Sequence, residues 1–174
     1  MGNEELVRRH AAGGGATAAA NAVGKVAVPA LGTVVLTCMD ARIDVSVLFG
    51  LEAGDAHVLR NAGGVVTDDV VRSLTISQRK LGTRDVLLVQ HTGCGLATFT
   101  DDSFSEELAT DTGMWPPWRP NAFSDPGVSV RRGMARLRRD PFLVRGTVVR
   151  GFVLDIERFT LAEVYAEEPV LPDV

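Results

Sequence analysis

The sequence predicts an α/β fold with a central, mostly parallel four-stranded sheet, helices on both faces and an antiparallel edge strand. From residue 33 onward, short apolar runs alternate with longer segments in which apolar residues recur at helical spacing. The apolar runs are nearly continuous, which is typical of parallel strands buried on both faces. These two patterns favour one domain with helices packed on each side of a parallel sheet.

The expected strands are the apolar runs themselves. The first four are expected to be parallel, and the last is expected to close the sheet as an antiparallel edge hairpin. In chain order the runs lie at 33–37, 56–61, 85–90, 147–156 and 161–166.

Three helices are expected between these strands, each with a recognisable end signal. Asp44 can cap a short helix that runs through residue 51. Thr67, followed by two aspartates in the first turn, begins the clearest helix in the chain, and Gly82 ends it. A third helix is expected from about 128 to 139, where Pro141 stops it.

Two segments lie outside this pattern. Residues 98–126, centred on a Trp-Pro-Pro-Trp sequence, are expected to form an irregular connection. Residues 1–32 are expected to form an N-terminal arm ahead of a domain that spans 33–174. Within the arm, a short helix over 4–12 is expected to break at Gly13–Gly15, and the alanine-rich 16–22 segment has helical propensity but almost no large side chain to bury.

Composition narrows the classes of function. The chain has 174 residues, 45% of them hydrophobic and 23% charged, as in a soluble globular protein of one domain. A net charge of −4 gives no reason to expect a nucleic-acid partner. No apolar run approaches the length of a membrane span, and no secretory signal precedes the two cysteines, so we expect a cytoplasmic protein with free thiols.

Metal-binding residue types cluster where two of the expected strands end. Cys38, Asp40 and Arg42 form a C-x-D-x-R motif after the first strand, and His91 and Cys94 form H-x-x-C after the third. Each motif alone is a weak signal. Together they supply two thiols and an imidazole at the carboxyl edge of one sheet, where α/β proteins bind ligands. This ligand set predicts a zinc site with three protein ligands and an open fourth position.

Asp40 has two possible roles so close to a metal. It can bind the metal as a fourth ligand, which closes the site. Alternatively it can pair with Arg42, whose planar guanidinium suits a carboxylate, and leave the fourth position to water. The sequence leaves both states open.

The two motifs, with the wording between them, resemble the compact bacterial and archaeal branch of the β-class carbonic anhydrases. The similarity extends from about 33 to 164. The segments that carry it read CMDARID, HVLRNAGG, VTDDVVRSL, SQRKLGTRDVLL and HTGCG. The resemblance implies one zinc per chain, a catalytic Asp40–Arg42 dyad beside it, and a homodimer or dimer of dimers. In that family the N-terminal region forms arms that pack on the partner subunit, a pattern that residues 1–32 fit poorly.

The resemblance implies a zinc enzyme that hydrates CO2 reversibly to bicarbonate and a proton through zinc-bound hydroxide. Because two thiolates lower the charge of the site, that activity is expected under mildly alkaline conditions. The same branch includes carbonyl sulfide and carbon disulfide hydrolases, which are the alternative. A non-catalytic zinc module is the third possibility, although the retention of Arg42 speaks against it.

Other residues near the motifs have more modest expected roles. Gly63, Gly93 and Gly95 are candidates for a substrate pocket, because glycine lets the backbone approach a ligand. Structural hydrogen bonding is favoured for Arg60, Asn61 and His57, and loop fastening for Trp115 and Trp118. Neither Gln78 nor Gln90 matches the substrate-binding glutamine of plant-type relatives.

Overall fold

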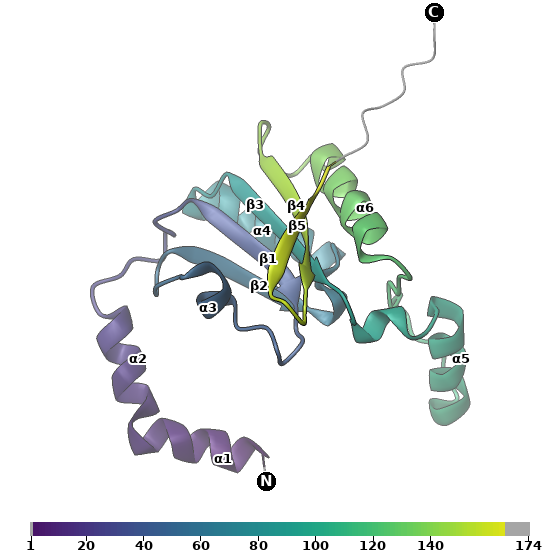
Figure 1. The fold of residues 1–174 in the computed structure, drawn as a ribbon, viewed down its shortest axis with the longest axis horizontal. Helices are drawn as coiled ribbons and strands as arrows, with labels where there is room; N and C mark the ends of the chain where they lie inside the picture. The colour runs from purple at the N-terminus through teal and green to yellow at the C-terminus, as the bar shows by residue number, and fades with distance from the viewer. Residues whose placement is uncertain (1, 166–174) are drawn as a thin grey trace, which may run out of the picture.

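The computed structural model describes residues 2–165, which fold around a five-stranded sheet of order β2-β1-β3-β4-β5 (Figure 1). Strands β1 to β4 are parallel, and β5 runs antiparallel to β4. This confirms the expected fold class and the antiparallel edge. The strands are Thr33–Cys38, Ala56–Asn61, Asp85–His91, Val148–Asp155 and Thr160–Val164. Residues 166–174, the end of the expected domain and of its last strand, lie outside the described part.

The central strands β1 and β3 lead into the C-x-D-x-R and H-x-x-C motifs. Their register pairs Thr33 with Asp85 and Thr37 with Val89, so both strands end at the same edge of the sheet. Both strands are almost wholly buried, which explains their near-continuous apolar sequences. The topology therefore brings Cys38 and His91 together at the carboxyl edge.

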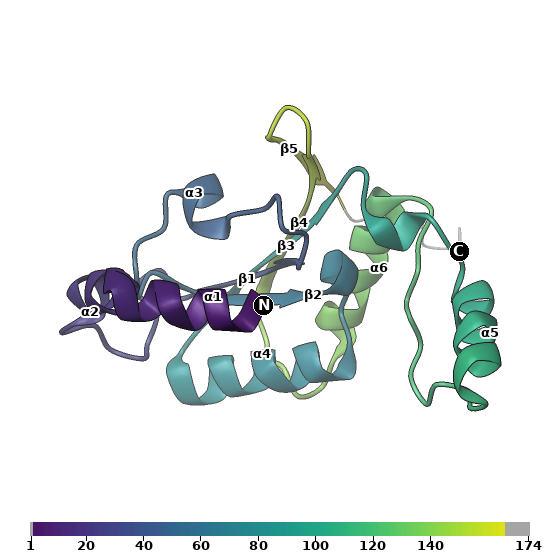
Figure 2. The same cartoon turned by 90° about the horizontal axis from the view of Figure 1, so that it is seen from below.

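Helices cover both faces of the sheet, as expected (Figure 2). On one face lie α4 (Asp68–Leu81) and α6 (Pro126–Arg139), which share a core cluster with β1, β3 and β4. On the other face lies the short α3 (Val45–Phe49), where Val45 packs in a second cluster with the strand residues Val35 and Val89. Cys38 and Cys94 belong to this second cluster.

The helix ends follow the expected capping chemistry. The Asp44 side chain accepts hydrogen bonds from the backbone N–H groups of Ser46 and Val47 at the start of α3.

Thr67 accepts a hydrogen bond from the Val70 N–H at the start of α4, and Gly82 ends that helix in the left-handed conformation with φ +76°. Helix α6 begins at Pro126, about two residues earlier than expected, because Asp125 caps it.

One expectation about the long connection is wrong, since it contains helix α5 (Asp101–Thr112). Thr100 and Ser103 form a reciprocal capping box at its start, and Gly113, with φ +74°, ends it. None of its residues is fully buried, and its sequence has no clear apolar stripe that would have predicted a helix. Helix α5 stands off from the sheet (Figure 2).

The arm is helical on both sides of the glycine triplet, and the break expected there is confirmed. Helices α1 (Gly2–Arg9) and α2 (Gly15–Ala22) flank the segment His10–Gly14. Gly13, with φ +123°, leaves the helical region and separates the two helices by a kink. The arm extends away from the sheet (Figure 1). Within 2–165, no helix has the length and apolar character needed to cross a bilayer.

Candidate metal centre

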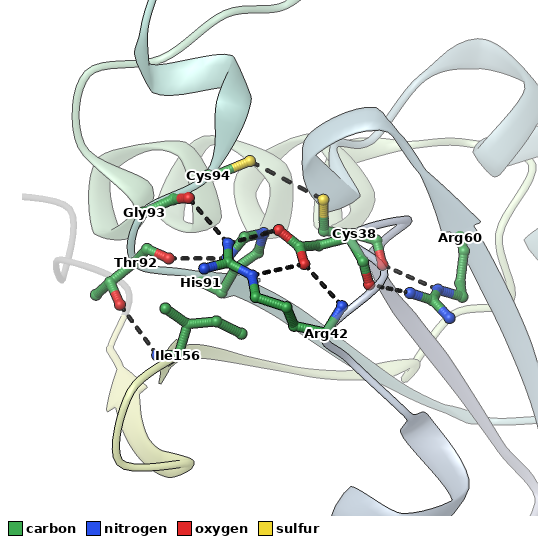
Figure 3. A network of polar contacts seen from close by, with 9 residues as sticks. Cys38, Arg42, Arg60, His91, Thr92, Gly93, Cys94 and Ile156 are labelled. Atoms are coloured by element: carbon green, nitrogen blue, oxygen red, sulfur yellow. Dashed lines mark hydrogen bonds and ion pairs between the residues drawn. The ribbon is translucent and has the colours of Figure 1, made fainter.

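Three potential metal ligands converge at the carboxyl edge of the sheet (Figure 3). Cys38 ends β1, His91 ends β3, and Cys94 follows a turn at Gly93, whose φ is +62°. The side chains are buried, and their ligand atoms all lie within 4.8 Å of one another. The two sulfur atoms are 3.9 Å apart, close to the ~3.8 Å expected of two thiolates on one tetrahedral zinc. The group has the composition and spacing of a metal site.

The imidazole of His91 has the orientation that a metal ligand needs. Its Nδ1 lies 2.8 Å from the carbonyl oxygen of Thr92, to which it donates in the neutral ring. Its Nε2 is buried and has no hydrogen-bond partner among the described residues. A buried polar atom without a partner is costly. The lone pair of Nε2 is therefore available to a metal ion between the two thiols.

The two thiols differ in acidity. Burial raises the pKa of Cys38, but the adjacent His91 ring and the backbone N–H groups of Asp40 and Gly63 outweigh it and bring the pKa to about 7. Burial raises the pKa of Cys94 to about 11, against the effect of the Leu96 backbone N–H. In the metal-free protein at neutral pH, Cys38 is thus readily ionised and Cys94 holds its proton.

Asp40 faces the cluster but is bonded to Arg42. Guanidinium Nε and Nη2 lie 2.9 and 2.7 Å from the two carboxylate oxygens, and the Arg42 backbone N–H adds a 2.9 Å bond. Arg42 also donates to the carbonyl oxygen of Gly93 at 3.2 Å. These contacts with Arg42 hold the pKa of Asp40 well below its usual range. One carboxylate oxygen still lies 3.7 Å from His91 Nε2, so the carboxylate borders the ligand atoms.

The turn that carries Cys38 and Asp40 is held from the neighbouring strand. Arg60 donates to the carbonyl oxygens of both residues, at 2.9 and 2.7 Å. Gly64 has φ +61°, and a Cβ there would lie 2.8 Å from the backbone nitrogen of Cys38. Asn61 exchanges two hydrogen bonds with the backbone of Val65 and closes this loop. The structural roles expected of Arg60 and Asn61 are confirmed.

The sequence model of the carbonic anhydrase family matches residues 33–119. The chain is also 49% identical over 130 residues to beta-carbonic anhydrase 1 of Mycobacterium tuberculosis, which covers 75% of this chain and 80% of the relative. The chain belongs to the β-class carbonic anhydrase family.

Other members of the family, and relatives with a different named substrate, are also similar. A carbon disulfide hydrolase of an Acidianus strain is 30% identical over 152 residues, covering 73% of this chain and 74% of the relative. The crystal structure of the carbonic anhydrase from Streptococcus mutans superposes with a TM-score of 0.85 at 34% identity, covering 95% of this chain and 98% of that one. The fold of this family thus covers 95% of the chain.

In this β-class chain the three glycines expected near the substrate differ in placement. Gly63 is buried with φ +76°, and a Cβ there would press on Leu96. Gly93 is exposed and turns its carbonyl oxygen toward Arg42. Gly95 is exposed at the start of a 3-10 turn. The backbone N–H of Gly63 contacts the Cys38 thiol, and that of Leu96 contacts the Cys94 thiol. These contacts could not be predicted from the sequence, because a motif of side chains does not indicate which backbone N–H groups face the site.

A cavity of about 610 Å³ lies beside the motif turn. Met39, Leu96, Phe99 and Trp118 contribute apolar walls, and Arg60 and Asn61 also line it. Trp118 therefore borders a cavity, whereas loop fastening was expected, and Trp115 is 65% exposed.

His57 belongs to another part of the β-class scaffold. Its Nδ1 lies 2.7 Å from Ser77 Oγ, and its Nε2 lies 3.1 Å from the carbonyl oxygen of Ala27. The structural role expected of this histidine is confirmed.

Proposed function

We propose that the chain catalyses the reversible hydration of CO2 to bicarbonate and a proton, with one Zn²⁺ per chain held by Cys38, His91 and Cys94. The proposal rests on three ligand atoms within 4.8 Å of one another, beside a carboxylate that is paired with Arg42. Two thiolates and an imidazole suit zinc, and three protein ligands leave a fourth position free. Stopped-flow CO2 hydration by zinc-replete protein is the direct test.

A zinc ion held by these residues would supply Lewis-acid activation of water. The chain's own contribution is orientation. Asp40 presents a fixed acceptor beside the ligand atoms, because Arg42 holds both of its oxygens. Since its pKa lies well below the usual range, Asp40 stays ionised and orients a donor rather than taking up its proton. A closed site with Asp40 as fourth ligand would require this ion pair to break, which argues against a purely structural module.

The substrate is proposed to be CO2 rather than carbonyl sulfide or carbon disulfide. The apolar cavity beside the motif turn suits any small uncharged molecule, and a carbon disulfide hydrolase is among the relatives. Hydrolysis of carbonyl sulfide or carbon disulfide, however, yields a product with a soft sulfur atom that binds zinc tightly. None of the described residues near Cys38, His91 and Cys94 has an evident means of preventing this product from binding the metal. We therefore propose that the chain is a hydratase of CO2.

We expect kcat/KM for CO2 to exceed that for carbonyl sulfide by at least about tenfold, roughly 1.4 kcal/mol in transition-state binding. Both rates are to be measured on one zinc-replete preparation, by stopped-flow hydration and by sulfide release. A ratio near or below one would reassign the chain to the sulfide hydrolases.

Zinc affinity should rise with pH, because zinc must displace the proton of Cys94. The pKa of that thiol is about 11, whereas that of Cys38 is about 7, so one thiol proton is released per zinc above neutrality. We expect the apparent association constant to rise about tenfold per pH unit between pH 7.5 and 9. Titration of metal-free protein against a chromophoric chelator measures it, with circular dichroism as a folding control. A constant that stays flat over this range would contradict the ligand assignment of Cys94.

We further propose that the protein is a homodimer or a dimer of dimers, in which the arm of residues 1–32 packs on a partner subunit. Leu6 and Val7 on α1 are 65% and 69% exposed, on an arm that extends from the sheet (Figure 1). Their burial against a second copy would remove apolar surface from water.

The double variant Leu6→Asp and Val7→Asp should shift the molar mass measured by light scattering toward that of one chain. Ile76→Asp, which changes an exposed apolar residue on α4, is the matched control and should leave the mass unchanged. An unaltered mass in the arm variant would contradict the proposed packing.

The cytoplasm is the proposed compartment. Cys38 and Cys94 are both free thiols, and each must stay reduced to bind zinc. A reducing compartment preserves that state, and cell fractionation with an antibody to the chain tests the assignment.

A further inference from the structure

A second cavity, of about 310 Å³, lies between α6, the 119–123 segment and Val65 and Val66. Its walls are unlike those of the apolar cavity. Arg119, Arg132 and Arg136 line it, and Asp101 is the only acidic residue among the lining residues. Asp101 is already engaged, since it accepts a hydrogen bond of 2.7 Å from the Ala122 backbone N–H. The cavity therefore has an excess of positive charge.

The three arginines differ in what they are free to bind. Arg136 is fixed, because it donates to the carbonyl oxygen of Val66 at 2.8 Å and forms an ion pair with Asp68. The guanidinium groups of Arg119 and Arg132 make no hydrogen bond or ion pair within residues 2–165. The unpaired guanidinium groups of Arg119 and Arg132 lie beside the fixed guanidinium of Arg136. Together they offer several N–H donors to a small anion that has more than one oxygen.

Neutral donors and a defined loop complete the cavity. Ser129 accepts a 3.0 Å hydrogen bond from the buried Gln90 side chain, which leaves its own O–H free to donate. Asn121 adopts a left-handed conformation, with φ +60°, and its amide donates to the Arg119 carbonyl oxygen at 2.8 Å. This contact orders the loop that carries Arg119.

The two cavities share a wall. Val65, Arg119 and Asn121 line both the arginine-walled cavity and the apolar cavity beside the motif turn. An uncharged substrate is compatible with the apolar side, whereas an anion is stabilised on the arginine side. Gln90 also precedes His91 on β3, so the Ser129 contact connects this cavity to the strand that carries a ligand of the candidate metal centre.

We infer that the cavity formed by Arg119, Arg132, Arg136 and Ser129 is a binding site for one small oxyanion, separate from the metal centre. Its donors suit the planar or tetrahedral oxygens of bicarbonate, sulfate or phosphate. Bicarbonate would come from the proposed reaction and the others from solution, and the inference does not depend on turnover.

Isothermal titration of zinc-replete full-length protein with bicarbonate and with sodium sulfate, at constant ionic strength, tests the site. We expect one saturable equivalent for at least one of the two anions. Arg132→Gln and Arg119→Gln should each weaken that binding at least about fivefold, because each removes charge-assisted hydrogen bonds. Both side chains lack partners in the described chain, so these variants should fold normally.

Arg139→Gln is the matched control, because Arg139 is an exposed arginine on α6 that does not line this cavity. It should leave binding unchanged. Tighter binding of bicarbonate than of sulfate would identify the product as the ligand, and the reverse would identify a free inorganic oxyanion. The inference is overturned if neither anion saturates, if Arg132→Gln binds like the wild type, or if Arg139→Gln weakens binding equally.

Discussion

Replacing Cys94 with serine is expected to remove most of the zinc and to lower kcat/KM for CO2 hydration by at least about 10³-fold. A serine hydroxyl is a much poorer zinc ligand than a thiolate, and the remaining Cys38 and His91 cannot complete a three-ligand site. Elemental analysis gives the zinc content, and stopped-flow hydration gives the rate on the same sample.

Met114→Leu is a suitable control for this substitution. The Met114 side chain is 71% exposed and belongs neither to the ligand group nor to the lining of the apolar cavity. The control should keep one zinc per chain and close to normal turnover. Full zinc retention by Cys94→Ser would show that the ligand assignment is wrong.

Arg42→Ala is expected to retain zinc and to lower kcat/KM by at least about 10²-fold. Without the guanidinium, the Asp40 carboxylate loses two hydrogen bonds, of 2.9 and 2.7 Å, and is free to turn toward the metal and close the site. Zinc content and stopped-flow rates separate this effect from loss of metal.

Arg150→Ala is the matched control, because Arg150 on β4 donates two similar hydrogen bonds, of 2.8 and 2.9 Å, to the carboxylate of Glu163 on the edge strand β5. It should leave turnover near normal. Normal turnover in Arg42→Ala would contradict the role proposed for the Asp40–Arg42 pair.

The wild-type rate is expected to rise steeply between about pH 7 and 9. The pKa of Asp40 is held well below its usual range by Arg42, so simple protonation of this carboxylate cannot produce a change at that pH. The rise in rate must come from another ionisation, such as that of the activated water. Release of Asp40 from any state in which it closes the metal site would add to the rise. A flat profile of kcat/KM from pH 6.5 to 9 would contradict this account.

Much of the fold could be predicted because its signals are local. The apolar runs of β1 and β3 are buried on both faces, and Thr67 and Gly82 mark the ends of α4. Helix α5 also had local signals, in the capping box of Thr100 and Ser103. It was missed because it packs few side chains against the sheet, and a helix that buries little has no strong apolar period.

The residues of the candidate site could be predicted, but the state of Asp40 could not. Parallel strands that end at one edge bring Cys38 and His91 together, and the residue types point to zinc. Whether Asp40 faces the metal or Arg42 depends on angles within a five-residue turn, held by Arg60 from another strand. A sequence pattern carries no information on such angles.

Zinc dependence is tested by measuring CO2 hydration with one preparation as purified, after zinc removal with a chelator, and after zinc is restored. Activity is expected to follow zinc content, to be nearly absent in the depleted protein and to recover at one zinc per chain. Activity that persists without zinc, or its absence in folded protein with one zinc bound at pH 8.5, would contradict the claim that this chain is a zinc-dependent CO2 hydratase.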